Sequence, residues 1–96
     1  MSIYARVAGT GSYLPEQRLT NQDLVERLAK SGLETSDEWI TTRSGISARH
    51  FAADNQLTSD LAVKAAQAAL SSSGITSADL DLIILATSTP DHLGGF

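Results

Sequence analysis

The stretch "LDLIILATS", residues 80–88, decides the fold class of this 96-residue chain. Its apolar residues from Leu82 to Ala86 follow one another without the alternation expected of a strand with one wet face. A continuous apolar run of this length is typical of a parallel strand that helices cover on both faces. The sequence therefore predicts an α/β domain that contains this strand.

The residues before this strand supply the helix that an α/β crossover needs. Residues 58–74 predict a long helix that Thr58 or Ser59 caps and Gly74 ends. Alanine is common on its apolar face, so the helix can approach a neighbour closely. That face consists of Leu61, Ala62, Ala65, Ala66, Ala69 and Leu70.

A first strand is predicted at residues 3–9, where apolar side chains alternate with Tyr4 and Arg6. The glycines of "GTGS" (9–12) follow it and predict a tight turn. A nucleotide-binding glycine loop is the competing interpretation. It fails because Leu14 stands where the third glycine is needed and no helix opens there.

Two short helices are predicted next along the chain. The first covers residues 19–32, with Thr20 or Asn21 as its cap and Gly32 as its stop. The second is "TSDEWITTRSGI", residues 35–46, and it holds the single Trp of the chain.

The second short helix carries the local signals of both helix ends. Thr35 and Glu38 have the spacing of a capping box. Arg43 suits the negative end of the helix dipole, and Gly45 can end the helix.

Only one long helix is predicted, although a strand buried on both faces needs helices above and below it. We therefore expect residues 1–96 to be the N-terminal portion of a larger domain whose remainder lies outside this chain.

Composition excludes several classes of site. The net charge of −4 gives no general attraction to nucleic acid or to an anionic membrane. The chain has no Cys, no apolar run of membrane-spanning length and no secretory signal in its first residues, so we expect a cytoplasmic protein. His50 and His92 lack partners at metal-ligand spacing, so no metal site is predicted. His50 next to Arg49 is interpreted as a surface or supporting residue, whereas His92 lies in a turn after the buried strand.

Trp39 and Arg43 are the candidate binding residues. They are four residues apart on one predicted helix, so their side chains lie over the same face. An indole beside a guanidinium suits an adenine nucleotide, because both planar groups can stack on a base. In the competing interpretation, which spacing alone favours, Trp39 packs on the core and Arg43 only stabilises the end of the helix.

Six motifs in order resemble the N-terminal segment of β-ketoacyl-acyl-carrier-protein synthase III, the initiating condensing enzyme of bacterial type II fatty acid synthesis. The resemblance covers nearly the whole chain. The motifs are "GTGSYLPE" at 9–16, "TNQDL" at 20–24, "TSDEWITTRSGI" at 35–46, "RHFA" at 49–52, "TSDLAVKAA" at 58–66 and "DLDLIILATSTPD" at 79–91.

The resemblance implies a thiolase-like fold with α-β-α-β-α layers, of which this chain holds only the first part of the N-terminal half, in a homodimer. It implies transfer of a short acyl group from acyl-coenzyme A to a Cys. Condensation with malonyl-acyl-carrier protein then gives 3-oxoacyl-acyl-carrier protein, CO₂ and coenzyme A. Acyl-coenzyme A is a substrate here, and no cofactor is implied. Two alternatives stay open: a specialised homologue that makes quinolones or polyketides, and a ketosynthase-like partner subunit that lacks the nucleophile.

The catalytic Cys, His and Asn of the family all fall outside these 96 residues, so no catalytic residue is expected here. The resemblance implies coenzyme A binding by Trp39, which matches the Trp that stacks on adenine, and by Arg43 and Thr35. It also implies that Phe96 lines the acyl pocket of the partner subunit. The family usually has two residues between Thr-Pro-Asp and this Phe, whereas four residues separate Asp91 from Phe96 here.

Overall fold

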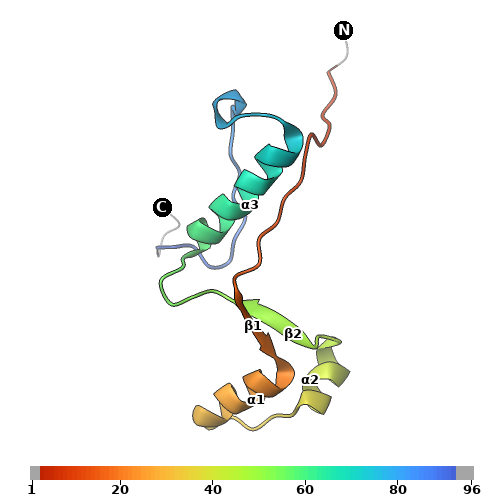
Figure 1. Cartoon of the computed structure of the whole chain (residues 1–96), viewed down its shortest axis with the longest axis vertical. Helices are drawn as coiled ribbons and strands as arrows, with labels where there is room; N and C mark the ends of the chain where they lie inside the picture. Colours follow the sequence, from red (N-terminus) through yellow and green to blue (C-terminus); the bar gives the residue numbers. More distant parts are fainter. Residues whose placement is uncertain (1–2, 93–96) are drawn as a thin grey trace. The chain divides into compact units, whose positions relative to one another are not determined.

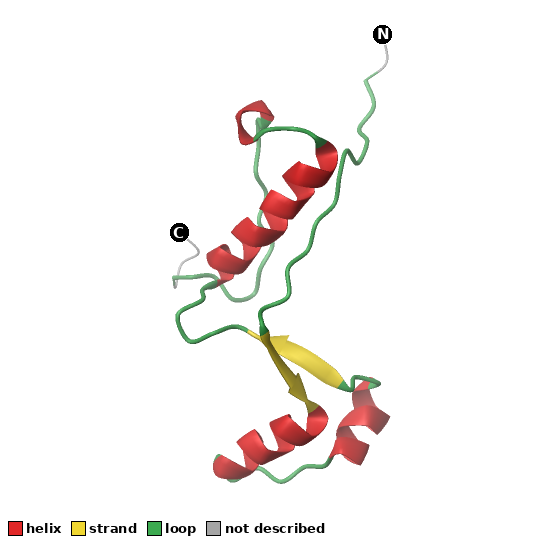
Figure 2. Cartoon of the chain, viewed as in Figure 1, coloured by secondary structure: helices red, strands yellow, loops and turns green. Residues whose placement is uncertain are grey.

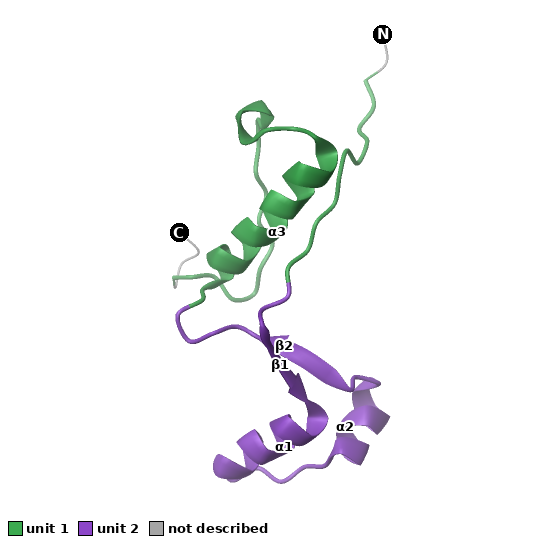
Figure 3. Ribbon diagram, viewed as in Figure 1, with its two compact units in different colours: residues 1–13, 56–96 green, residues 14–55 purple. Residues whose placement is uncertain are grey.

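The computed structural model describes residues 3–92, which form two compact units. Unit 1 combines residues 1–13 with residues 56–96, and unit 2 is residues 14–55 (Figure 3). The elements in chain order are β1 (Gln17–Thr20), α1 (Asn21–Lys30), α2 (Asp37–Ser44), β2 (Ala48–Phe51), α3 (Thr58–Ser73) and the 3-10 helix η1 (Ser77–Asp79), as Figure 1 shows.

Unit 2 is built on two short antiparallel strands that the sequence patterns did not predict. Figure 2 shows β1 and β2 as two neighbouring arrows. They pair in a register that places Gln17 opposite Phe51 and Thr20 opposite Ala48. Each strand has four residues, which is too short for a periodic pattern to stand out. The chain passes directly from β1 into α1, and α1 packs against α2.

The predicted helix over residues 19–32 is confirmed as α1. Thr20 is its cap: the Thr20 hydroxyl accepts from the backbone N–H of Asp23, and the Asp23 carboxylate accepts from the N–H of Thr20 at 2.9 Å. At the other end Gly32 has a φ of 84°. The N–H of Leu33 donates to the carbonyl of Leu28 at 3.0 Å, so the chain turns back in a Schellman motif.

α3 forms the centre of unit 1 and confirms the predicted long helix. Gly74, with a φ of 74°, ends it as expected. The predicted cap is wrong, because the helix starts after Leu57 rather than after Thr58 or Ser59. Carboxylates replace a cap hydroxyl at this end. Asp60 accepts from the N–H of Leu57 at 2.8 Å, and Asp91 accepts from the N–H of Ser59 at 2.9 Å.

Both strands predicted in unit 1 are extended segments without a hydrogen-bonded partner strand in the described part of the chain. Residues 82–86, predicted to be buried on both faces, are exposed: Leu82 has 76% and Ile84 has 84% of its surface accessible. Residues 3–8 are exposed in the same way. A β-strand needs backbone hydrogen bonds to a neighbouring strand. An apolar run in the sequence does not show whether that neighbouring strand is present.

The glycines of "GTGS" serve close packing rather than the predicted tight turn. Residues 9–12 are extended, and neither Gly9 nor Gly11 has a positive φ. A Cβ on Gly9 would lie 2.6 Å from the backbone nitrogen of Ser73, and one on Gly11 would lie 2.6 Å from the carbonyl oxygen of Ala65. The alanine-rich face of α3 thus allows the backbone of residues 9–11 to lie against it.

The described residues contain no helix that is both long and apolar enough to cross a membrane.

Candidate functional site

Trp39 stands on α2, a two-turn helix with defined ends. Ser36 is the cap, and its hydroxyl accepts from the N–H of Trp39 at 3.1 Å. Gly45 has a φ of 69° and ends the helix, as predicted. The Trp39 side chain leaves 55% of its surface exposed, so within this chain it does not pack into a core.

Arg43 covers one face of the indole. Its guanidinium carbon lies 5.3 Å from the centre of the Trp39 ring, within the range of a cation–π contact. The prediction that both side chains share one face of the helix is therefore confirmed. The guanidinium lies over the indole, so the pair presents two planar groups at one exposed position.

Two hollows in unit 2 adjoin Trp39. The smaller has a volume of about 340 Å³ and is lined by Ser36, Glu38, Trp39, Thr42 and Arg43. The larger has a volume of about 570 Å³ and is mostly apolar. It is lined by Leu24, Leu28, Leu33, Glu34, Thr35, Ser36, Trp39 and Ile40. Leu28 and Leu33 meet there because the Schellman motif folds the chain back at the end of α1.

Thr35 is not the helix cap that its spacing from Glu38 predicted. Ser36 caps α2, so Thr35 lies one residue before the cap, and its hydroxyl does not bond to the N-terminal N–H groups of the helix. The hydroxyl oxygen is buried at the larger hollow and has no hydrogen-bond partner among the described residues. A buried hydroxyl in this state can bond to a ligand without first giving up a protein partner.

The three predicted binding residues therefore gather around one helix. Trp39 is shared by both hollows, Thr35 lines the larger one and Arg43 lines the smaller one. A flat aromatic face, a cation and a free hydroxyl are the groups that a nucleotide base with an attached phosphate would use. Phe96, the fourth predicted site residue, lies outside the described residues.

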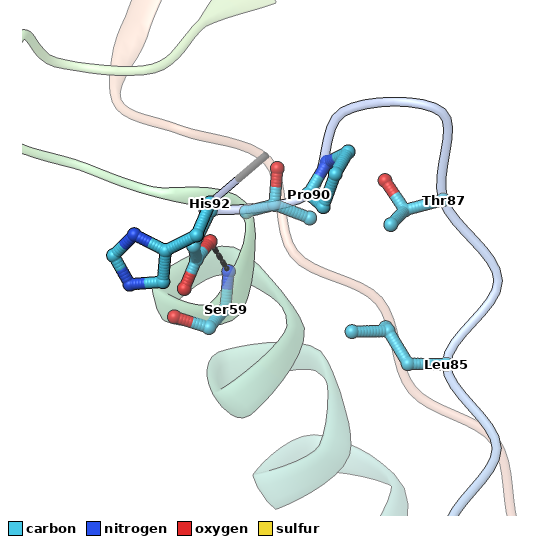
Figure 4. A pocket seen from close by; sticks show the side chains of 7 residues that line it. Ser59, Leu85, Thr87, Pro90 and His92 are labelled. Carbon is cyan, nitrogen blue, oxygen red and sulfur yellow. Dashed lines mark hydrogen bonds between the residues drawn. The ribbon is translucent and has the colours of Figure 1, made fainter. Parts of the chain in front are cut away.

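A further hollow, of about 350 Å³, lies in unit 1 between the first turn of α3 and residues 85–92 (Figure 4). Hydroxyl groups hold this loop: Thr58 donates to the carbonyl of Thr89, whose N–H donates to the Thr87 hydroxyl at 3.0 Å. The Ser59 side chain and backbone N–H donate to Asp91 and hold the pKa of its carboxyl below the ordinary value of 3.8.

The surroundings of His50 and His92 do not indicate a catalytic role for either. The Nδ1 of His50 lies 2.6 Å from the carbonyl oxygen of Pro15, so the half-buried ring ties two parts of unit 2 together. His92 is exposed at the edge of the unit 1 hollow. Within residues 3–92 no group of three or more His, Asp or Glu residues could hold a metal ion.

Sequence patterns missed Asn21, which is the most buried polar residue of unit 2. Its position in the sequence indicates only an alternative cap for α1. Its side chain is 1% exposed and contacts Asp37, Thr41, Ile46 and Arg49. These partners lie 16 to 28 residues further along the chain, so no local spacing reveals them.

The chain matches no family model, but three solved structures are similar to it over most of its length. The crystal structure of 3-oxoacyl-[acyl-carrier-protein] synthase III from Aquifex aeolicus VF5 is 46% identical over 90% of this chain and 26% of that one, with a TM-score of 0.74. The enzyme of the same name from Pseudomonas aeruginosa PAO1 is 45% identical over 91% and 25%, with a TM-score of 0.75. The β-ketoacyl-[acyl carrier protein] synthase III of Thermus thermophilus is 42% identical over 93% and 26%, with a TM-score of 0.74. The chain thus spans about a quarter of the length of each.

Proposed function

Because the chain belongs to the 3-oxoacyl-acyl-carrier-protein synthase III family, we propose that it forms the coenzyme A-binding part of a condensing enzyme that starts fatty acid synthesis. In the first step a Cys thiolate outside this chain attacks the thioester carbonyl of a short acyl-coenzyme A and releases coenzyme A. In the second step malonyl-acyl-carrier protein loses CO₂, and the resulting carbanion attacks the acyl-cysteine. The products are 3-oxoacyl-acyl-carrier protein and the free thiolate.

The observation that carries this proposal is the exposed pair of Trp39 and Arg43 beside the Thr35 hydroxyl. An exposed indole supplies one apolar wall, and the adenine of coenzyme A supplies the other. The guanidinium can contact the base or an anionic phosphate. The thiolase-like layering and the homodimer belong to the same proposal.

The deciding experiment replaces Trp39 or Arg43 by Ala in the full-length enzyme. Base stacking on an aromatic ring contributes roughly 1–3 kcal/mol, and a charge-assisted hydrogen bond roughly 1.5–3 kcal/mol. Each variant should therefore bind acetyl-coenzyme A about 5- to 150-fold more weakly. Condensation should persist once the enzyme has been acylated by another route, because malonyl-acyl-carrier protein presents no adenine.

Thermal unfolding separates this proposal from the packing interpretation of Trp39. A tryptophan in a core costs roughly 3–5 kcal/mol when it is cut back to Ala, with affinity per folded molecule unchanged. An exposed clamp residue should instead leave the melting temperature nearly constant. Lys30→Ala, which removes an exposed cation from the last turn of α1, is the matched control for Arg43→Ala.

Phe96 is proposed to line the acyl pocket of the partner subunit. Phe96→Ala should then raise kcat/KM for longer or branched acyl-coenzyme A relative to acetyl-coenzyme A, because each extra buried CH₂ contributes about 0.8 kcal/mol. A primer series measures this, and unchanged relative values would remove Phe96 from the pocket.

The four residues between Asp91 and Phe96 favour one second candidate, a specialised homologue that makes quinolones or polyketides. A homologue of this kind makes quinolones or polyketides, or transfers its acyl group to another nucleophile. Assays of the full-length enzyme with free acceptors distinguish the two candidates.

A further inference from the structure

Asn21 makes hydrogen bonds to α2 and to the segment that follows it. Its amide nitrogen lies 2.8 Å from Oδ1 of Asp37, 3.1 Å from Oγ1 of Thr41 and 2.8 Å from the carbonyl oxygen of Ile46. Its backbone N–H donates to the carbonyl of Ser47 at 3.0 Å. One residue at the start of α1 thus holds the first turn of α2, its middle and the chain that leaves it.

Charge fixes which way the Asn21 amide points. Its oxygen accepts from the guanidinium of Arg49 at 2.6 Å, and its NH₂ group donates toward the carboxylate of Asp37. The amide dipole therefore lies between a cation and an anion in its favourable direction. The reversed amide would place NH₂ against Arg49 and oxygen against Asp37, so the arrangement admits a single orientation.

Apolar burial contributes little to fixing the position of α2, although α1 packs against it. Ile40 is its one buried apolar side chain among the residues described, and it retains 9% exposure. In a helix each residue advances about 100°, so Trp39 and Arg43 lie about 200° and 240° around the axis from Asp37. Thr41 lies about 40° from Asp37. The side of α2 that Asn21 holds is therefore opposite the side that presents the stacked pair.

We propose that Asn21 is a positioning residue that sets the angle at which α2 presents Trp39 and Arg43 to coenzyme A. The inference rests on the proposed function of that pair and deepens it. Because the Asn21 amide makes the hydrogen bonds that tie this two-turn helix to the start of α1, its loss lets the helix rotate or tilt while the packing of α1 on α2 keeps the unit folded. The effect reaches the ligand only through Trp39 and Arg43.

The first test is Asn21→Asp in the full-length enzyme. A carboxylate still accepts from Arg49 but cannot donate to Asp37 or to the Ile46 carbonyl. Acetyl-coenzyme A should bind about 5- to 50-fold more weakly per folded molecule, the loss expected when buried acceptors lose their donor. Gln22→Glu makes the same chemical and charge change at the exposed neighbouring residue and should change the affinity less than about twofold.

Rescue by a complementary change tests the geometry. The double variant Asn21→Asp with Asp37→Asn exchanges the two groups, so residue 37 now donates from its NH₂ group and residue 21 accepts. The net charge stays that of the wild type. Most of the lost affinity should return in this double variant. A merely destabilised enzyme would show a lower melting temperature and an unchanged dissociation constant in the fraction that remains folded.

A double-mutant cycle with Trp39→Ala asks whether Asn21 acts through the indole. In the Trp39→Ala background, Asn21→Asp should cause less than about a twofold further loss, because there is no ring left to misplace. Additive losses would overturn the positioning role while leaving the clamp intact. Normal affinity in Trp39→Ala itself would sink the clamp and, with it, the positioning role.

If Asn21→Asp does not fold, Thr41→Val carries the test. It removes one acceptor of the Asn21 amide and keeps the shape of the side chain. A weaker affinity at an unchanged melting temperature, with condensation by the pre-acylated enzyme unaffected, is the expected result. An unchanged affinity for acetyl-coenzyme A in folded Thr41→Val would overturn the proposal.

Discussion

Thr35 shows how one shift of a helix cap changes the chemistry of a residue. With Ser36 as the cap, the Thr35 hydroxyl is buried and unpaired among residues 3–92, at the edge of the apolar hollow beside Trp39. An unpaired buried hydroxyl costs stability and is tolerated where a ligand completes it. The residue is thus better suited to binding than to holding the helix.

Thr35→Val should therefore separate binding from stability. The melting temperature should stay the same or rise, because the variant removes a hydroxyl that has no partner in the protein. Acetyl-coenzyme A should bind about 2- to 12-fold more weakly, the equivalent of one neutral hydrogen bond. Calorimetric titration and thermal unfolding measure both, with Thr35→Ser as the control that keeps the hydroxyl. A fall in melting temperature at constant affinity would assign Thr35 to the fold.

Gly11 is a second residue whose identity is set by a neighbour, because α3 leaves no room for a side chain. An added Cβ would lie 2.6 Å from the carbonyl oxygen of Ala65, and backbone cannot move aside as a flexible side chain can. Gly11→Ala should lower the free energy of unfolding by roughly 1–3 kcal/mol, the usual cost of overpacking. Denaturant unfolding measures this, and Thr10→Ala at the exposed residue beside it should have little effect. Equal stability of the two variants would contradict the close contact with α3.

At the scale of elements, the start of α3 depends on a carboxylate from a loop 32 residues further along the chain. The Ser59 side chain and backbone N–H hold the pKa of Asp91 below 3.8. A carboxyl whose pKa is lower in the folded state than in the unfolded state stabilises the fold at every pH above its unfolded pKa. That stability is lost as the pH falls through the folded value.

Asp91→Asn should therefore be less stable than wild type at neutral pH, and the difference should stay constant down to about pH 4. Below 3.8 the difference should shrink, because the Asp91 carboxyl takes up a proton first in the unfolded wild-type chain and, at lower pH, in the folded one, where its contact with Ser59 then weakens. Melting temperatures of both proteins across this range measure it. Asp81→Asn, at an exposed carboxylate of the same unit, is the matched control. A difference that persists unchanged well below pH 3 would assign the contact to shape rather than charge.

The helices could be predicted because their signals are local. Gly32, Gly45 and Gly74 each follow a helix with a positive φ, as their positions in the sequence indicate. The caps were less predictable: Thr20 is one of the two residues predicted for α1, whereas Ser36 is the cap in place of Thr35, and Leu57 in place of Thr58 or Ser59. Neighbouring hydroxyl residues compete for the same backbone N–H groups, so spacing alone cannot choose between them.

The strands could not be predicted because pairing is not local. β1 and β2 join residues about 30 positions apart, and neither carries a distinctive apolar pattern. The segments that do carry one, residues 3–9 and 82–86, are unpaired extended chain in the described structure. The candidate site also has a local part and a non-local part. The contact of Trp39 with Arg43 could be predicted from their spacing of four residues, whereas the hydrogen bonds of Asn21 to distant residues could not.

At the scale of the whole chain, the apolar surface of unit 1 is the main liability. Ile83, Ile84 and the neighbouring leucines expose more than half of their surface, as do Ile3 and Val7. A 96-residue polypeptide should self-associate at micromolar concentration, because unpaired apolar strands pair with one another. Sedimentation should detect this, and Ile84→Lys should reduce it. A monodisperse, monomeric wild-type polypeptide would contradict the prediction.

The two units also differ in their chromophores. Trp39 lies in unit 2, whereas Tyr4 and Tyr13 both belong to unit 1. Fluorescence excited at wavelengths that only indole absorbs therefore reports on residues 14–55. The ultraviolet absorbance of the tyrosine phenols reports on the other unit. Tyr13 is further marked by the ammonium of Lys64, 5.5 Å from its ring centre. Each half of the chain thus carries its own optical label, and the order in which the halves melt can be followed in one unlabelled sample.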